Sequence, residues 1–361
     1  MKKSVSIISI LVFGITFFGN FYFDLQAFEK IPVGNCKNLY FNDRALLFSG
    51  NANLPLAEEV AKYLDVPLGK ATVSRFNDGE IQIRIDESVR NMDVFILQPT
   101  CPTVDQSIND NLMELFLLIR TMKRSSASSI TAIIPYYGYA RQDRKTSPRV
   151  PISASDVALL LEEAGVDRVV TVDLHCGQIQ GFFRNVPVDN LYAATMFVPY
   201  FAKKGLQNVV VVSPDAGGVD RAKKFIDYLA SEGVHAQLAI ISKQRAKAGV
   251  VDSMNLIGEV KGSDVIIVDD LCDTAGTLVK AAQLLKDQGA CRVFAAITHP
   301  VFSGAALDRI RHSVIEEMVI SNTIPLNGEV PDNIKCISVA PLLGESIRRI
   351  YLGESVSELF Q

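Results

Sequence analysis

The sequence predicts an α/β protein built from two similar domains, and three observations support this. Short apolar runs typical of buried parallel strands recur along the chain, among them Val265–Val268 and the stretch 208–213 (NVVVVS). Most of these runs lead through a polar or small-residue turn into a segment with helical spacing of apolar residues. The units form two successive sets of about 150 residues each, so we expect one mainly parallel sheet flanked by helices to occur twice.

Length and composition fit such a protein. A chain of 361 residues with 48% apolar and 21% charged residues can bury a core in each of two domains. The formal net charge of -4 gives no basic surface for nucleic acid, so any bound nucleotide is expected to be a small molecule. The six cysteines form no CxxC pair, which argues against a zinc cage or a disulfide framework and favours a cytoplasmic protein with reduced thiols.

The N-terminus points in another direction. Lys2 and Lys3 precede an uncharged run over residues 4–23, which is typical of a signal peptide or membrane anchor. An organelle-targeting leader is one alternative, and upstream sequence translated from a start codon placed too early is another. We therefore expect a leader outside the fold at residues 1–43, an N-terminal domain at 44–189 and a C-terminal domain at 190–361.

The first domain opens with a strand at 45–49, a polar turn and a helix that begins near Pro55. An Asp-Gly turn in the segment Phe76–Glu80 precedes the alternating run 81–85, which predicts a hairpin. A buried strand follows at 93–98 and a helix at 110–122.

A strand at 130–135 delivers an unusual segment, Tyr136–Lys145, with three tyrosines and three cations in its ten residues (YYGYARQDRK). Aromatic rings can stack on a base and cations can hold a polyphosphate, so the segment has the chemistry of a nucleotide lid. The alternative is a surface loop with solvated charges.

Polar residues follow the next predicted strands. His175 comes just after the strand 168–173, and Asp215 follows the strand 208–213 in a glycine-rich turn. Either side chain can take part in a metal or phosphate site, although a lone histidine is more often structural. The structural interpretation is preferred for three histidines: His235, His299 and His312. The strand 235–242 delivers Lys243 and, two residues on, Arg245, cations that can stabilise charge in a transition state or simply face solvent.

The stretch Val265–Thr277 (VIIVDDLCDTAGT) combines a buried strand, two acids and a small-residue turn, and it is the main candidate for a ligand site. Asp269 and Asp270 end its apolar run, at the strand end where open α/β sheets bind ligands. The turn Asp273–Thr277 offers backbone N–H groups, two threonine hydroxyls and a helix N-terminus, which suit a phosphate. Acids beside such a turn fit a ribose phosphate, with sugar hydroxyls on the carboxylates; the alternative is a helix capped by Asp273.

Four motifs in this order, together with the segment FNDGE, resemble the ribose-phosphate diphosphokinase family over residues 45–361. They are YYGYARQDRK, DLHCGQIQGFF, SPDAGGVDRAK and VIIVDDLCDTAGT. The resemblance implies two tandem type I phosphoribosyltransferase-like domains. It also implies Mg²⁺-dependent transfer of pyrophosphate from ATP to the 1-hydroxyl of ribose 5-phosphate, which gives phosphoribosyl pyrophosphate and AMP.

The resemblance also implies roles for individual residues. Lys243 and Arg245 would be catalytic, and His175 and Asp215 would bind the metal. Ribose 5-phosphate would be held by Arg245 and by seven residues after the strand: Asp269, Asp270, Asp273, Thr274, Ala275, Gly276 and Thr277. ATP would be held by six residues, of which the first four reach a neighbouring subunit and so imply a homo-oligomer: Phe76, Asp78, Gly79, Glu80, Arg141 and Gln142.

Some positions depart from the family or bear on regulation. Arg184 stands where relatives often carry an acid, and Gln244 where they often carry a cation. Arg90, Ser355 and Ser357 resemble a regulatory site for phosphate and ADP. Two rival functions are a type I phosphoribosyltransferase, which would lack the Arg141 lid, and a non-catalytic homologue, which would have lost residues that this chain retains.

Overall fold

The computed structural model describes residues 44–244 and 253–360. The predicted leader, residues 1–43, therefore lies outside the described residues, and so does Arg245. Within the described part, no helix combines the length and the apolar character that crossing a membrane requires.

The first half contains a five-stranded parallel sheet in the order β1-β4-β5-β6-β7. Its strands are β1 (Ala45–Ser49), β4 (Asp93–Leu97), β5 (Ser129–Ile134), β6 (Arg168–Val172) and β7 (Val188–Leu191). The hairpin of β2 (Ala71–Arg75) and β3 (Ile81–Ile85) forms a separate antiparallel pair. The helices are α1 (Leu54–Leu64), α2 (Ile108–Arg124), α3 (Ser153–Ala164) and the 3₁₀ helix η2 (Gly177–Phe182).

The second half contains a seven-stranded sheet in the order β10-β9-β8-β11-β12-β13-β14, parallel except for the pair β9–β10. Its strands are β8 (Val209–Ser213), β9 (Ala236–Gln244), β10 (Ser253–Ile257), β11 (Asp264–Cys272), β12 (Arg292–Pro300), β13 (Glu317–Ser321) and β14 (Ile334–Ile337). The helices from α4 on are α4 (Ala194–Ala202), α5 (Val219–Ser231), α6 (Gly276–Asp287), α7 (Ala306–Arg311), α8 (Ala340–Leu352) and η3 (Val356–Phe360).

The two halves repeat one topology, as the sequence predicts. The order β1-β4-β5-β6-β7 corresponds to β8-β11-β12-β13-β14, and a hairpin follows the first strand in each case. The expected boundary between residues 189 and 190 falls inside β7, so the first sheet extends to Leu191. Helix α8 begins at Ala340, and Pro341 fits its first turn without loss of a hydrogen bond.

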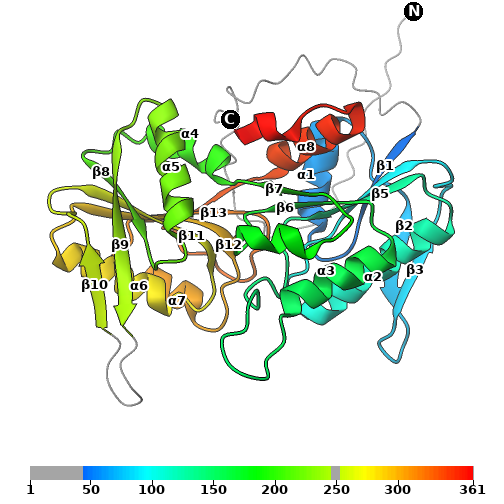
Figure 1. The fold of residues 1–361 in the computed structure, drawn as a ribbon, viewed down its shortest axis with the longest axis horizontal. Coiled ribbons are helices and arrows are strands. Elements are labelled where there is room, and N and C mark those ends of the chain that lie inside the picture. The colour runs from blue at the N-terminus through cyan, green and yellow to red at the C-terminus, as the bar shows by residue number, and fades with distance from the viewer. Residues whose placement is uncertain (1–43, 245–252, 361) are drawn as a thin grey trace, which may run out of the picture.

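Each repeat ends in a helix that packs on the other repeat. Helix α4 follows β7 and packs on α5, whereas α8 follows β14 and packs on α1, as Figure 1 shows for the red and blue helices. One hydrophobic core therefore spans both halves, with Leu56 and Val60 from α1 together with Leu343 and Ile347 from α8. This shared core fixes the position of the strand ends of one half relative to the other.

The second sheet has a topological switch point between β8 and β11. From β8 the chain order runs one way to β9 and the other way to β11 and β12. Ligands bind beyond the carboxyl ends of strands at such points in open α/β sheets. This places the predicted acids of β11 where a ligand is expected.

Candidate functional site

A cavity of about 710 Å³ lies where the two halves meet, beyond the carboxyl ends of β6 and β11. His175 and Asp173 reach it from the first half, and Asp269 and Arg221 from the second. The structure thus brings together residues far apart in the sequence, two of which, His175 and Asp269, are predicted site residues.

The acid pair lies at the carboxyl end of β11, inside the strand rather than just after it. His175 Nδ1 donates to Asp270 Oδ2 at 2.8 Å. Arg221 Nη1 lies 3.1 Å from Asp270 Oδ1 and 3.4 Å from Asp269 Oδ1. With only 4% of its side chain exposed, Asp270 is held by partners on both carboxylate oxygens, while Asp269 faces the cavity.

Charge is distributed unequally over this pair. Burial raises the pKa of Asp269 well above its ordinary value, and the neighbouring Asp270 adds to the rise. Burial opposes charge on Asp270 as well, but Arg221 and the hydrogen bond from His175 outweigh it and lower the pKa of Asp270. The same hydrogen bond raises the pKa of His175 against the effect of burial. Asp270 is therefore committed to Arg221 and His175, whereas Asp269 lines the cavity and is the one suited to a hydroxyl ligand.

Arg221 was not singled out from the sequence, although it is part of this site. It comes from the first turn of α5 and also donates to the carbonyl of His175, at 3.5 Å. The motif SPDAGGVDRAK carries two cations beside its acids, Arg221 and Lys223, and this was a usable signal, because buried acids need a positive partner.

Asp215 is directed into its own loop. Its Oδ1 accepts from Gly217 N at 2.9 Å and from Gly218 N at 3.0 Å, and its carbonyl accepts from Ser213 Oγ at 2.6 Å. A Cβ on Gly218 would lie 2.9 Å from Ser213 Oγ, so this tight turn requires a glycine.

A metal cage of three or more His, Cys, Asp or Glu side chains does not occur among residues 44–244 and 253–360. The two predicted metal residues have protein partners instead, since His175 bonds to Asp270 and Asp215 to its own loop. These donors still fit Mg²⁺, because that ion is usually bound through one or two carboxylates, waters and substrate phosphates rather than by an all-protein cage.

The predicted phosphate turn leads directly into α6. Ala275 adopts a left-handed backbone conformation with φ of 60°, and the helix starts at Gly276. Arg309 Nη1 donates to Thr274 O at 2.7 Å and braces the turn from α7. The N–H groups at the helix start are available to an anion, so the turn has the geometry that the sequence analysis expects.

Arg141 of the first half reaches this turn. Its Nη1 lies 2.7 Å from Asp273 Oδ2, in an ion pair that crosses between the halves. A hydrogen bond with Ser303 and this guanidinium hold the pKa of Asp273 below its ordinary value. Gln142 accepts from Ser153 Oγ at 2.5 Å, at the start of α3. One predicted ATP residue, Arg141, is thus adjacent to a predicted sugar-phosphate residue, Asp273.

Two of the three tyrosines before Arg141 do not have the expected role. Tyr136 and Tyr137 are 6% and 3% exposed, and they pack on His299 and Phe183. Burial raises the pKa of Tyr136 to about 12. The suggestion that these rings stack on a base is wrong for both, because β5 leads them into the interior. His299 is structural as predicted, and its Nε2 donates to Val172 O at 3.0 Å.

The two predicted catalytic residues are placed only in part. Lys243 lies in β9, where its backbone is paired with Met254 of β10. Arg245 lies outside the described residues. The catalytic assignment of both remains a prediction.

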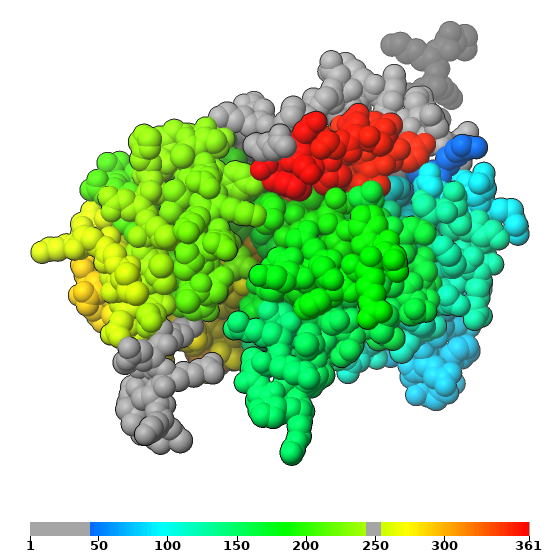
Figure 2. All heavy atoms as spheres, in the orientation of Figure 1, coloured from blue at the N-terminus to red at the C-terminus, as the bar shows by residue number. Residues whose placement is uncertain are grey.

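The hairpin tip with Phe76, Asp78, Gly79 and Glu80 is not brought to Arg141 within one chain. It extends from the side of the first half that faces away from the second half (Figure 1). Figure 2 shows the tip, in light blue, standing out from the body. Phe76 is 50% exposed.

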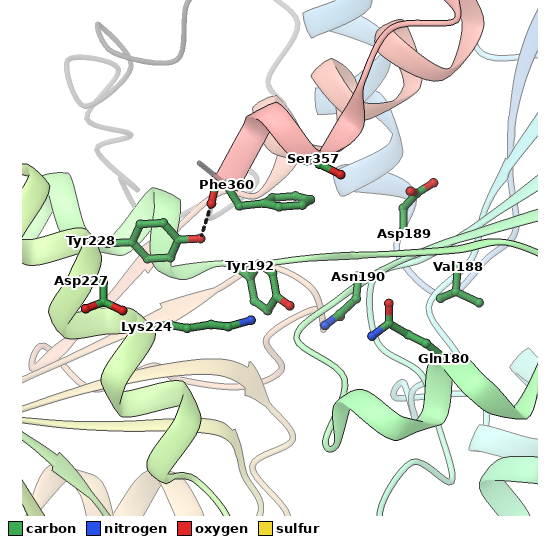
Figure 3. A pocket seen from close by; sticks show the side chains of 10 residues that line it. All are labelled: Gln180, Val188, Asp189, Asn190, Tyr192, Lys224, Asp227, Tyr228, Ser357 and Phe360. Carbon is green, nitrogen blue, oxygen red and sulfur yellow. Dashed lines mark hydrogen bonds between the residues drawn. The ribbon is translucent and has the colours of Figure 1, made fainter.

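The predicted regulatory residues are also apart. Ser357 lines a second cavity of about 460 Å³ with Asn190, Tyr192 and Lys224 (Figure 3). Arg90 instead points to Ser126 Oγ, at 3.4 Å, and the carbonyl of Ser355 accepts from Arg349 Nη1 at 2.7 Å.

Comparison with known proteins decides between the families that share such a site. Residues 45–165 match a family model described as the N-terminal domain of ribose phosphate pyrophosphokinase, and residues 231–361 match one described as the phosphoribosyl synthetase-associated domain. The chain is 56% identical to a ribose-phosphate pyrophosphokinase of Wolinella succinogenes over 315 residues, which cover 87% of this chain and 98% of that protein. The chain belongs to the ribose-phosphate pyrophosphokinase family.

Other members agree with this assignment. A ribose-phosphate pyrophosphokinase of Campylobacter jejuni is 54% identical over 87% of this chain and 98% of its own length. The crystal structure of phosphoribosylpyrophosphate synthetase from Mycobacterium smegmatis has 42% identity and a TM-score of 0.78, and the match covers 86% of this chain and 99% of that one. The resemblance inferred from the sequence is confirmed, together with the tandem phosphoribosyltransferase-like fold and the enzyme activity that it implies.

Proposed function

We propose that this chain transfers the β,γ-pyrophosphoryl group of ATP to the 1-hydroxyl of ribose 5-phosphate and releases AMP. The observation that carries the proposal is the adjacency of an acid pair, a phosphate turn and Arg141, whose guanidinium lies 2.7 Å from the turn residue Asp273. Family membership supplies the reaction. A type I phosphoribosyltransferase would not need the cation of the first half at this place.

The sugar phosphate would be seated by β11 and the turn that follows. Asp269 faces the cavity and takes the sugar hydroxyls, while Asp270 stays tied to His175 and Arg221. The 5-phosphate accepts N–H groups of the turn Asp273–Thr277 at the start of α6, where the helix dipole favours an anion. Arg245 would close the phosphate end.

ATP would lie beside the phosphate turn, on the side of the first half. Arg141 and Gln142 hold it through its phosphates, and His175 with Asp215 would hold Mg²⁺ in contact with those phosphates. When bound, Mg²⁺ neutralises part of the polyphosphate charge. Arg141 must exchange its pairing with Asp273 for the incoming phosphates, which costs little because half of its side chain is exposed.

The transfer is an in-line displacement. The oxygen of the 1-hydroxyl forms a bond to the β-phosphorus, the bond from that phosphorus to the α,β-bridging oxygen breaks, AMP leaves with that oxygen, and the hydroxyl proton is released. No covalent enzyme intermediate is needed, so positioning and fixed positive charge from Lys243, Arg245 and Arg141 account for most of the rate. Lys243→Ala should bind ribose 5-phosphate almost normally and lower kcat by about 10²–10³.

A homo-oligomer follows from the hairpin tip. The hairpin tip that carries Phe76, Asp78, Gly79 and Glu80 extends on the side of the first half that faces away from the second half, so we propose that these residues complete the ATP site of a neighbouring subunit. Mixing a Phe76→Ala chain with a Lys243→Ala chain tests this idea. Hybrid oligomers should regain activity, whereas a sum of the two separate activities would contradict the shared site.

Regulation by phosphate and ADP is proposed with Arg90, Ser355 and Ser357. Because Arg90 lies away from Ser357 in one chain, this site too would be shared between subunits. We also propose that the enzyme acts in the cytoplasm, with organelle targeting or membrane anchoring through residues 1–23 as the alternative; fractionation of cells that express the tagged full chain distinguishes these locations.

The direct test mixes the full chain with ATP, ribose 5-phosphate and Mg²⁺ and follows AMP, with and without inorganic phosphate. AMP that forms only when the sugar phosphate is present supports the proposal. Nucleotide formation from phosphoribosyl pyrophosphate and a free base would instead indicate a phosphoribosyltransferase, and no reaction would indicate a non-catalytic homologue. Acceleration by phosphate supports the regulatory proposal in the same assay.

A further inference from the structure

The hairpin β2–β3 is attached to the body in two different ways along its length. Near its base, Val73, Ile83 and Ile85 pack against the hydrophobic core of the first half, and Asn51 Nδ2 donates to Val73 O at 3.1 Å. The hairpin forms a two-stranded sheet of its own rather than an edge of the five-stranded sheet. Apolar packing therefore holds the base of the hairpin against the body, whereas the tip is outside this packing.

The tip is a tight turn closed by its own backbone. Phe76 N donates to Glu80 O at 2.8 Å, and Gly79 N donates to Phe76 O at 2.9 Å. Gly79 has φ of +95°, a conformation that favours glycine. These bonds set the shape of the turn but not its orientation relative to the body.

Arg75 supplies that orientation. It is the last residue of β2, and its Nη1 donates both to Gly79 O and to Asp110 Oδ1, at 3.1 Å each. One guanidinium nitrogen thus bridges the outer side of the turn and the first turn of α2. About a third of each side chain is exposed, so the pair is only partly screened by solvent.

Asp110 is a rigid anchor for this bridge. Its Oδ2 accepts from Ser107 N at 2.8 Å and from Ser107 Oγ at 2.6 Å, which completes the capping box of α2. These bonds from Ser107, with a smaller contribution from Arg75, hold the pKa of Asp110 below its ordinary value. One oxygen of the carboxylate thus belongs to the helix cap and the other to the hairpin.

We propose that Arg75 is a positioning residue for ATP, which couples the tip Phe76–Glu80 to helix α2 through Asp110. This inference rests on the proposed role of the tip in the ATP site of a neighbouring subunit. Arg75 itself touches no substrate. It narrows the range of tip orientations, so that less conformational freedom is lost when ATP binds.

The test compares two Arg→Ala changes in one hairpin, made in the full chain. Arg75→Ala removes the bridge to the tip. Arg84→Ala is the matched control, since Arg84 also pairs with an aspartate, Asp86, at 2.6 Å, but on β3 at the base and with 72% of its side chain exposed. Both variants keep the apolar base and are expected to fold.

Arg75→Ala should raise KM for ATP by about two- to fivefold, the range that a partly exposed ion pair allows. The value of kcat at saturating ATP, KM for ribose 5-phosphate and the oligomer size should stay unchanged, and Arg75→Lys should recover part of the loss. Arg84→Ala should match the wild type. A merely structural role would instead lower kcat or the amount of oligomer.

Phe76→Ala separates this inference from the proposed function. If Phe76→Ala leaves KM for ATP unchanged, the role of the tip in the ATP site is wrong. If Phe76→Ala raises KM for ATP but Arg75→Ala does not, the role of the tip survives and the bridge from Arg75 to Asp110 has no part in positioning it.

Discussion

In the second half, Asp215 follows β8 and Asp269 lies at the carboxyl end of β11. In the first half, Asn51 follows β1 and Gln98 follows β4 at the equivalent places. The strand register supports this correspondence, since Phe48 is level with Ile96 in one half and Val212 is level with Ile267 in the other. One half thus presents carboxylates at its switch point, and the other presents neutral amides.

The first half supplies its own anion. The carboxylate of Glu114, from α2, accepts from Asn51 N and Nδ2 at 3.1 Å each, from Gln98 Nε2 at 3.0 Å and from Gln106 Nε2 at 2.5 Å. Glu114 is completely buried. A bound phosphate would have to displace this carboxylate, so the same topology gives an open ligand site in one half and a closed polar core in the other.

The largest expected effect separates the two equivalent positions. Asp269→Asn should lower kcat/KM for ribose 5-phosphate by about 10²–10³, because it removes a carboxylate from the sugar site. Gln98→Ala should lower stability and leave that ratio near the wild-type value when assayed well below its melting temperature. Equal losses of kcat/KM in both variants would mean that the two halves share the catalytic work.

The next effect tests the closed half. Glu114→Ala leaves several buried donors without an acceptor, each worth about 1–3 kcal/mol, so the free energy of unfolding should fall by about 3 kcal/mol or more in urea denaturation. Glu114→Gln, which keeps an acceptor oxygen, should lose less. An alanine variant as stable as the wild type would show that Glu114 is not the anion of this network.

A smaller difference lies at the other end of the same strands. Asp264 begins β11 and accepts from Arg292 Nη2 at 2.6 Å, whereas Asp93 begins β4 and accepts from the neutral Ser129 Oγ at 2.6 Å. Asp264→Asn should lower the free energy of unfolding by about 1.5–3 kcal/mol and Asp93→Asn by about 0.5–1.5 kcal/mol, because a hydrogen bond between two charged groups is stronger than one to a neutral hydroxyl. Comparable costs would remove this distinction between the halves.

The cost of Asp264→Asn should depend on pH. The hydrogen bond from Arg292 lowers the pKa of Asp264 in the folded state, so this carboxylate stabilises the fold above its ordinary pKa of 3.8 and the stabilisation disappears as pH falls through the lowered value. The difference in free energy of unfolding between wild type and Asp264→Asn should therefore shrink below about pH 4. A constant difference down to pH 2 would contradict this cause.

The smallest expected effect concerns the contact between the halves. With 52% of the Arg141 side chain exposed, its pair with Asp273 should contribute about 0.2–1 kcal/mol to stability. Arg141→Ala should thus melt almost like the wild type while KM for ATP rises. A large loss of stability would make Arg141 a structural link rather than a substrate ligand.

These comparisons show what the sequence could and could not reveal. Local patterns predicted the strands, the hairpin that leads into Ile81 and the turn between β11 and α6, because each depends on neighbouring residues. Two other features join segments far apart in the chain, namely the hydrogen bond between His175 and Asp270 and the packing of α4 and α8 on the opposite repeat. The spacing of apolar residues carries no information about such long-range contacts. The prediction for Tyr136 and Tyr137 was wrong for the same reason, because the composition of a segment does not show which of its rings face the core.

The central claim is that the second half alone seats the sugar phosphate. Equilibrium binding of ribose 5-phosphate to the full chain, with Mg²⁺ and a non-hydrolysable ATP analogue present, tests it most directly. We predict one ribose 5-phosphate per chain, with binding lost in Asp269→Asn and retained in Glu114→Gln. Two ribose 5-phosphate molecules per chain, or full binding by Asp269→Asn, would contradict it.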